Sequence, residues 1–125
     1  MPLQKPWQRW RSGWEHEREI PNTLGVYEIA NESGEVIYIG FAGGRSLFGL
    51  RGELKKHFEG RGNSVTSEQG AQFRYEINMQ YMSRYRDLLQ RYNEDHGDVP
   101  IGDKLPGEYV PSLGRFNWKS PDATV

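Results

Sequence analysis

The sequence predicts an α+β domain built on a small three-stranded antiparallel sheet flanked by helices. Two runs rich in Val, Ile and Tyr between residues 24 and 42 flank a polar turn, which is typical of a β-hairpin. A third run, residues 72–79, alternates apolar with polar side chains. Apolar residues recur every three or four positions over 47–58 and 82–92, as on one face of a helix. We expect an N-terminal helical segment and an irregular C-terminal tail around this core.

Length and composition predict a single domain without cysteine chemistry. The 125 residues are enough for one hydrophobic core but not for two. The chain has no Cys, which excludes disulfides, thiolate nucleophiles and Cys-ligated metal clusters. No run of about 18 apolar residues and no apolar leader is present, so we expect no membrane insertion and a cytoplasmic location. We divide the domain into an N-terminal segment (1–21), a core (22–97) and a tail (98–125).

The N-terminal segment is rich in tryptophan. Trp7, Trp10 and Trp14 follow one another at spacings of three and four, which predicts one face of a helix that Pro6 begins and Pro21 ends. Large aromatic residues at this spacing usually pack against a core, and we favour that interpretation. Two alternatives stay open. The tryptophans are interleaved with arginines and could stack on nucleic-acid bases, or they could mediate docking of a protein partner or self-association.

The hairpin and the first core helix have clear local signals. Gly34 lies in the turn between the two strands and can adopt the positive φ that a tight turn requires. A Gly-Gly pair then ends the second strand, and Ser46 is the predicted N-cap of a helix that ends near Gly60. The stretch that follows, residues 60–71, is polar and rich in glycine, which is typical of a mobile loop.

The third strand and the last helix follow this loop. The strand is predicted by three apolar residues that alternate with polar ones, namely Phe73, Tyr75 and Ile77. The helix over 82–92 is expected to end before Gly97, a typical C-terminal stop. Charged residues at spacings of three and four on its polar side are expected to pair with one another, namely Arg84, Asp87 and Arg91.

Two triplets in the predicted hairpin resemble the motif that gives the GIY-YIG endonuclease superfamily its name. Ten residues separate Gly25-Val26-Tyr27 from Tyr38-Ile39-Gly40. In that family the triplets lie on the first two strands of a three-stranded antiparallel sheet, a helix follows the second triplet, and another helix follows the third strand. The element order predicted here over residues 24–97 agrees with that layout. The resemblance implies hydrolysis of DNA phosphodiester bonds with one divalent ion, Mg²⁺ or Mn²⁺.

The resemblance also implies roles for the residues at matching positions. Tyr27 and Tyr38 match the motif tyrosines, which help to activate water in the family, and His57 matches a His or Tyr on the first helix. A tyrosine can relay a proton only with the help of a base, because its ordinary pKa is near 10. The alternative is that both are strand tyrosines whose rings pack and whose hydroxyls meet water.

The charged members of the family site match less directly. Glu53 stands where the family has an arginine that stabilises transition-state charge, so Arg51, or else Arg45 in the preceding loop, is the candidate for that role. No acid occupies the family's metal-binding position on the last helix. Glu76 on the third strand is the candidate metal ligand, provided that strand order places it beside Tyr27 or Tyr38; the alternative is an exposed strand glutamate.

Charge placement is compatible with a nucleic-acid partner, which the family resemblance implies is DNA. The formal net charge of −1 argues against a histone-like polycation. Residues 43–62 nevertheless contain five basic residues against two acidic ones, and the candidates for phosphate contacts are Arg45, Lys55, Lys56 and Arg61. Residues 93–109 contain one basic residue against five acidic ones. An ordinary solvated face would explain the same charges. From the resemblance and the charges together, we expect a GIY-YIG-like nuclease or, as the alternative, a catalytically degenerate relative that binds nucleic acid or protein.

Overall fold

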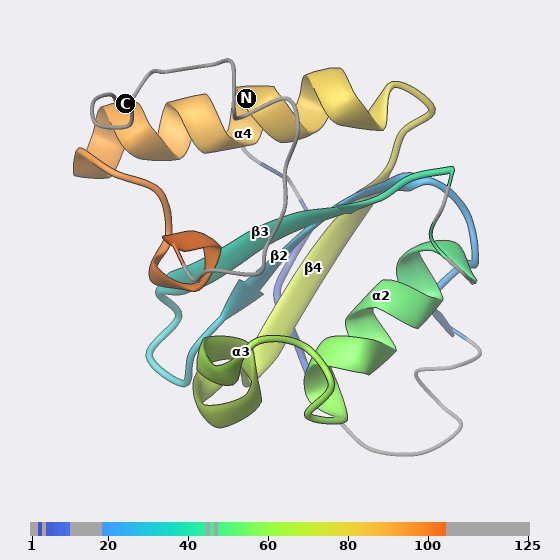
Figure 1. Ribbon diagram of the computed structural model, residues 1–125, viewed down its shortest axis with the longest axis horizontal. Coiled ribbons are helices and arrows are strands. Elements are labelled where there is room, and N and C mark those ends of the chain that lie inside the picture. The colour runs from blue at the N-terminus through green and yellow to red at the C-terminus, as the bar shows by residue number, and fades with distance from the viewer. Residues whose placement is uncertain (1–2, 4, 11–18, 45, 47, 105–125) are drawn as a thin grey trace.

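An antiparallel sheet of four strands lies between one long helix and two shorter helices (Figure 1). The computed structural model describes residues 3, 5–10, 19–44, 46 and 48–104. In sheet order the strands are β1 (Gln8–Arg9), β4 (Gln72–Ile77), β2 (Gly25–Ala30) and β3 (Val36–Ala42). The predicted α+β class is confirmed, and the sheet has one strand more than predicted.

Helices cover both faces of this sheet. On one side lie α2 (Gly49–Phe58) and α3 (Ser64–Gln69), and on the other side lies α4 (Tyr81–His96), as Figure 1 shows. A short 3₁₀ helix, η1 (Ile101–Lys104), follows α4 and contacts β3 and α3. No helix among these described residues is long and apolar enough to cross a membrane.

The additional strand, β1, lies where we predicted the beginning of a helix. Gln8 pairs with Phe73 and Arg9 pairs with Gln72 along β4. The helix prediction is wrong for these residues because the edge of β4 offers free backbone donors and acceptors, which a pattern of local side chains cannot reveal. The rest of the predicted helix, residues 11–18, lies outside the described residues.

Two tryptophans flank β1 and project toward opposite faces of the sheet. The guanidinium of Arg74 lies 4.2 Å from the centre of the Trp7 ring, whereas Trp10 stacks on Phe58 with ring centres 4.6 Å apart. An extended chain places positions that differ by three on opposite faces, so the helical spacing is misleading here. Trp10 packs against the core, as we favoured, whereas the printed contact of Trp7 is with the Arg74 guanidinium; Trp14 lies outside the described residues.

The alternation of β2 divides its side chains between two hydrophobic clusters. Tyr27 and Ile29 belong to the cluster under α2, together with Tyr38, Leu50, Leu54 and Phe73. Val26 belongs to the cluster under α4, together with Ile39, Tyr85, Leu88 and Leu89. Because neighbouring residues of a strand point to opposite faces, this division decides which site residues can meet.

The start of α2 differs from the prediction, whereas Gly60 follows its last turn with a φ of 80°, as predicted. The residue before the helix is Phe48, with a left-handed φ of 66°, and its side chain makes no capping hydrogen bond. The hydroxyl of Ser46 instead accepts a hydrogen bond from the Gly43 amide at 2.9 Å. Ser46 therefore closes the preceding turn rather than capping the helix.

Residues 64–69 form helix α3, so the predicted loop is wrong there. The side chain of Asn63 caps this helix by accepting a hydrogen bond from the Thr66 amide at 2.9 Å. Thr66 is buried, whereas most of its neighbours are polar and exposed. A six-residue helix with one buried polar side chain has too little apolar periodicity to be found by pattern.

The hairpin turn, the third strand and the last helix are confirmed. Gly34 has a φ of 90° in the turn. Strand β4 alternates as predicted at Phe73 and Tyr75, which are buried, whereas Ile77 at its end is exposed. Gly97 ends α4 in the left-handed conformation, with a φ of 83°.

Candidate functional site

The two motif tyrosines meet His57 on the α2 side of the sheet. The hydroxyl of Tyr27 lies 2.9 Å from His57 Nε2. The Tyr38 ring lies 4.7 Å from the imidazole and 6.0 Å from the Tyr27 ring, between ring centres. Strands β2 and β3 supply the tyrosines and the last turn of α2 supplies the histidine. We call these three residues the tyrosine–histidine cluster.

A chain of hydrogen bonds assigns the proton positions in this cluster. The hydroxyl of Thr66 donates to the Asn63 carbonyl at 3.2 Å, so its oxygen accepts at 2.9 Å from His57 Nδ1. A neutral imidazole that carries its proton on Nδ1 accepts at Nε2. Tyr27 is therefore the donor in the Tyr27–His57 hydrogen bond.

The environment of His57 keeps its imidazole neutral. Burial, with a smaller contribution from the nearby positive charge of Lys56, lowers the pKa of His57 from 6.5 to about 3. A neutral imidazole has a lone pair that can accept a hydrogen bond from a phenol, although a pKa of about 3 makes this imidazole a weak base. The pair has the donor and acceptor arrangement that proton transfer from Tyr27 would require.

The cluster is closed off from the surface. Tyr27 is 1% exposed, His57 2% and Tyr38 7%. Gly62 packs so closely on the imidazole that a Cβ there would overlap Nδ1, and a Cβ on Gly102 of η1 would lie 3.1 Å from the Tyr38 ring. The loop before α3 and the 3₁₀ helix thus cover the side chains that a hydrolytic site would present to water and phosphate.

The residues that close the cluster were not predicted from the sequence. Asn63 ties the two covering segments together by donating from Nδ2 to the Gly102 carbonyl at 3.0 Å. One sequence signal was available for α3, since Asn three residues before Thr is a typical N-cap arrangement. No local signal connects residue 63 with residue 102.

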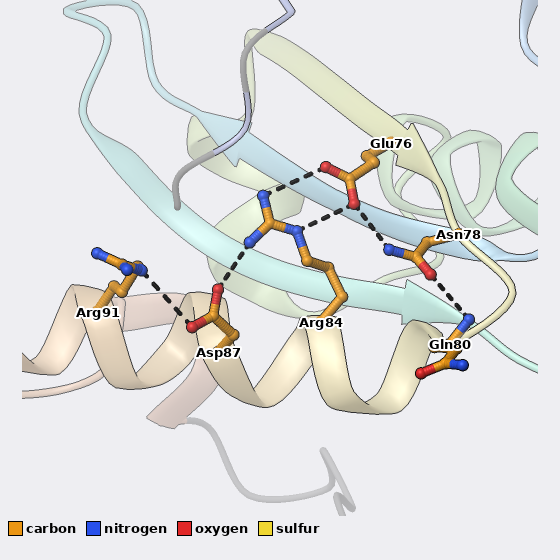
Figure 2. Close-up of polar contacts among 6 residues, drawn as sticks. All are labelled: Glu76, Asn78, Gln80, Arg84, Asp87 and Arg91. Atoms are coloured by element: carbon orange, nitrogen blue, oxygen red, sulfur yellow. Dashed lines mark hydrogen bonds and ion pairs between the residues drawn. The ribbon is translucent and has the colours of Figure 1, made fainter.

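Glu76, the predicted metal ligand, lies on the opposite face of the sheet from the tyrosine–histidine cluster. In the register between β2 and β4, Tyr75 is paired with Tyr27 and Glu76 with Val26. Figure 2 shows the Glu76 carboxylate held by Arg84 of α4, whose Nε and Nη2 donate at 3.0 and 3.2 Å. The expectation that Glu76 joins the motif tyrosines is wrong, because strand alternation sends its side chain toward α4.

The Glu76 carboxylate is part of an ion-pair network that connects β4 to α4 (Figure 2). Arg84 also donates to Asp87 at 2.7 Å, and Arg91 lies 3.5 Å from the other oxygen of that carboxylate. Burial alone would raise the pKa of Glu76, but hydrogen bonds from Arg84 and Asn78 outweigh burial and lower it. The predicted pairing along α4 is confirmed, and its Arg84 member also fixes the end of β4.

We expect the Arg84→Met substitution to lower the free energy of unfolding by roughly 1–2 kcal/mol, because the half-buried Glu76 carboxylate loses its ion pair and keeps only the hydrogen bond from Asn78. Arg91 is the matched control, since its side chain is 50% exposed and pairs with the same aspartate. Arg91→Met should cost less than about 0.5 kcal/mol. Urea unfolding of the two variants measures the difference; equal losses would contradict an anchoring role for Arg84.

Arg51, the first candidate for the arginine of the site, is not brought to the tyrosine–histidine cluster. Arg51 donates from Nε to the Ile20 carbonyl at 2.7 Å at the start of α2. Six residues separate it from His57, which corresponds to about 9 Å along a helix axis. Arg45, the other candidate, lies outside the described residues.

The basic side chains on the outer surface of α2 pair with neighbouring glutamates. Lys56 lies 3.3 Å from Glu53, and Lys55 lies 3.9 Å from Glu59. Arg61 lies 2.8 Å from the other oxygen of Glu59. These pairs are substantially exposed, so each contributes little to stability and can exchange for another partner.

The described residues do not fit the divalent ion that the family resemblance implies. Among them, no three His, Cys, Asp or Glu side chains gather in a way that could hold a metal ion. Glu76 is turned away from the motif tyrosines, and Glu53, one turn before His57, pairs with Lys56. In the part of the chain that the structure describes, the tyrosine–histidine cluster is a buried, neutral, hydrogen-bonded group of side chains and not a metal centre.

The comparisons with known proteins place the chain in a family without assigning a function. The profile of the DUF7508 family, a domain of unknown function, matches residues 1–95. The chain therefore belongs to the DUF7508 family. A search of the curated proteins gave no match.

Proposed function

We propose that this protein is a catalytically degenerate GIY-YIG-like domain. In this proposal it binds nucleic acid, and DNA in particular, through the outer surface of α2 and does not cleave it. The observation that carries the proposal is the burial of the motif side chains, with Tyr27 1% and His57 2% exposed. A hydrolytic site must admit water and a phosphodiester to its reactive groups. Here the same groups are used to pack and hydrogen-bond the core.

The outer surface of α2 supports the binding part of the proposal. Residues 48–62 contain four basic and two acidic side chains, and His57 in the same stretch is neutral. The side chains of Lys55 and Lys56 are 38% and 42% exposed, and that of Arg61 is 60% exposed. Phosphate oxygens can replace the glutamates as partners at little cost, because exposed ion pairs are weak.

Hydrolysis is the competing function, and one observation favours it. Tyr27 donates its phenolic proton to a neutral imidazole at 2.9 Å, which is the contact that a base-assisted tyrosine would make. It would require the segments around Gly62 and Gly102 to open and a carboxylate to arrive from elsewhere. The non-hydrolytic proposal needs neither change.

A binding titration tests the proposed surface. We expect fluorescently labelled duplex DNA to bind the full chain at low salt and to lose affinity as the salt concentration rises. The double substitution Lys55→Glu and Lys56→Glu should weaken binding at least about tenfold, because it removes two phosphate contacts and adds repulsion. Anisotropy measures both effects, with single-stranded DNA and RNA as parallel probes.

The matched control changes the same amount of charge on the other side of the sheet. The double substitution Arg86→Glu and Arg91→Glu on α4 should change the affinity far less than the α2 variant. Equal losses would reject α2 as the contact surface, and no binding to any of the three nucleic acids would reject the proposed partner. The same samples are incubated with Mg²⁺ or Mn²⁺; cleavage that Tyr27→Phe abolishes would overturn the non-hydrolytic part.

A further inference from the structure

A groove of about 660 Å³ opens between the C-terminal half of α4 and the turn that joins β2 to β3. These two borders lie at the same end of the sheet in Figure 1. Its lining includes Glu28 of β2, Arg74 of β4 and the rings of Tyr92 and His96 on α4. The nucleic-acid surface proposed above uses none of these residues, so an inference about the groove does not depend on it.

The groove is lined by a buried carboxylate with an unused acceptor. Glu28 is 5% exposed, and its Oε1 accepts from Arg74 Nε at 2.7 Å. Within the described part of the chain, its second oxygen, Oε2, has no hydrogen-bond donor. A buried charged acceptor is costly to leave without a partner. Oε2 is therefore a place where a ligand donor would be well bound.

Arg74 offers hydrogen-bond donors beside this acceptor. Its Nε donates to Glu28, and its Nη1 makes a long contact of 3.4 Å with the Lys5 carbonyl. The Trp7 ring lies under the guanidinium, with its centre 4.2 Å away, and fixes the plane of that group. A guanidinium has five N–H donors, so Arg74 can bind a ligand acceptor while it keeps Glu28.

The charges around the groove favour a neutral ligand. Three carboxylates line it, those of Glu28, Glu35 and Asp95, against two guanidinium groups, those of Arg74 and Arg91. This balance disfavours an anion. The Arg74 guanidinium already neutralises the buried carboxylate, so a second cation gains little.

The aromatic wall favours a planar ligand. The rings of Tyr92 and His96 are stacked, with centres 4.0 Å apart and planes inclined by 18°. Because the two rings cover each other's inner faces, a flat heterocycle can stack only on the outer face of this pair while its edge makes hydrogen bonds. The groove also lies within the range of volumes that hold small ligands.

We propose that this groove binds the base of a neutral nucleoside, with an exocyclic amino group donating to Glu28 Oε2 and Arg74 donating to the adjacent ring nitrogen. Adenine and cytosine have this arrangement of a donor beside an acceptor. The proposal predicts preference for a base with an amino group over one without it. It also predicts that a 5′-phosphate weakens binding, because the phosphate adds negative charge next to the groove's carboxylates.

Calorimetric titration of the full chain tests the proposal with two nucleosides that differ in one group. Adenosine should bind at least about tenfold more tightly than purine riboside, which lacks only the exocyclic amino group. Glu28→Gln keeps the shape of the side chain but replaces one carboxylate oxygen with a donor. The affinity of this variant for adenosine should therefore fall to the affinity that the unsubstituted protein has for purine riboside, or below it.

Two further variants control for folding and for position. Glu35→Gln removes an exposed carboxylate of the same groove and should keep the preference for adenosine, whereas His96→Ala, an exposed position, should weaken both nucleosides through lost stacking. Absence of adenosine binding at millimolar concentration, or equal affinity for the two nucleosides, would overturn the proposal. If the Glu28→Gln variant does not fold, the His96→Ala variant provides the test. An adenosine affinity equal to that of the unsubstituted protein would then overturn the proposal. Loss of DNA binding in the α2 variants leaves the nucleoside result unaffected.

Discussion

We expect the domain to lose roughly 3 kcal/mol of its free energy of unfolding between pH 7 and pH 4.5, and to lose it through His57. The folded-state pKa of His57 is about 3, against 6.5 for an ordinary histidine, chiefly because the imidazole is buried. Below pH 6.5 the unfolded chain binds a proton at this residue and the folded chain does not. Lowering the pH therefore favours unfolding, down to the folded-state pKa.

The pH range separates this effect from the carboxylates. The pKa of Glu76 is also lowered on folding, and the stability that Glu76 contributes is lost as the pH falls below its ordinary value of 4.5. Among the described groups with a lowered pKa, only His57 has an ordinary value above 4.5, so we attribute most of the slope between pH 6.5 and about 5 to His57. Urea titrations at half-unit pH steps over this range measure it directly.

Substitution of the histidine provides the control. Glutamine at position 57 is neutral at every pH, so His57→Gln should remove most of the slope above pH 4.5, while His96→Gln on the exposed end of α4 should preserve it. An NMR titration of the imidazole offers a second reading that needs no variant, because the His57 ring signals should stay constant from pH 8 to pH 4.5. A midpoint near 6.5 for those signals would refute the buried neutral state.

The elements that could be predicted from the sequence are those with local signals. The hairpin, β4 and α4 each have apolar residues at the spacing of one element, and the hairpin and α4 also have a glycine at the required position, Gly34 and Gly97. Strand β1 has no such signal, because its two residues become a strand only through pairing with Gln72 and Phe73, more than sixty positions away. Helix α3 was missed for a related reason, since its one buried side chain, Thr66, is polar.

The candidate site divides along the same line. The motif triplets predicted that Tyr27 and Tyr38 lie together, and a helical position matched His57, all of which the structure brings into contact. The placement of Glu76 depended on cross-strand register. Strand alternation places Glu76 and Tyr75 on opposite faces of the sheet. Only the pairing of Tyr75 with Tyr27 shows that Glu76 lies on the face away from the motif tyrosines, where it cannot complete a metal site with them.

The motif glycines have a packing role that leads to the second large effect. A Cβ on Gly40 would overlap the Tyr27 ring across the strand pair and would lie 2.8 Å from Tyr38 Cε2. We expect Gly40→Ala to lower the free energy of unfolding by roughly 1–3 kcal/mol, because neither buried ring has room to move. Thermal and urea unfolding measure the loss.

A matched glycine in the next turn separates this overlap from a general effect of adding a methyl group. No atom lies within 4 Å of a Cβ built on Gly44. Gly44→Ala should therefore stay within about 0.5 kcal/mol of the unsubstituted protein. Displacement of the Tyr27 ring in Gly40→Ala should also weaken the Tyr27–His57 hydrogen bond, so this variant should show a smaller acid slope than Gly44→Ala. Equal stabilities and equal slopes for the two variants would mean that the second motif glycine is not required by the packing of the tyrosine–histidine cluster.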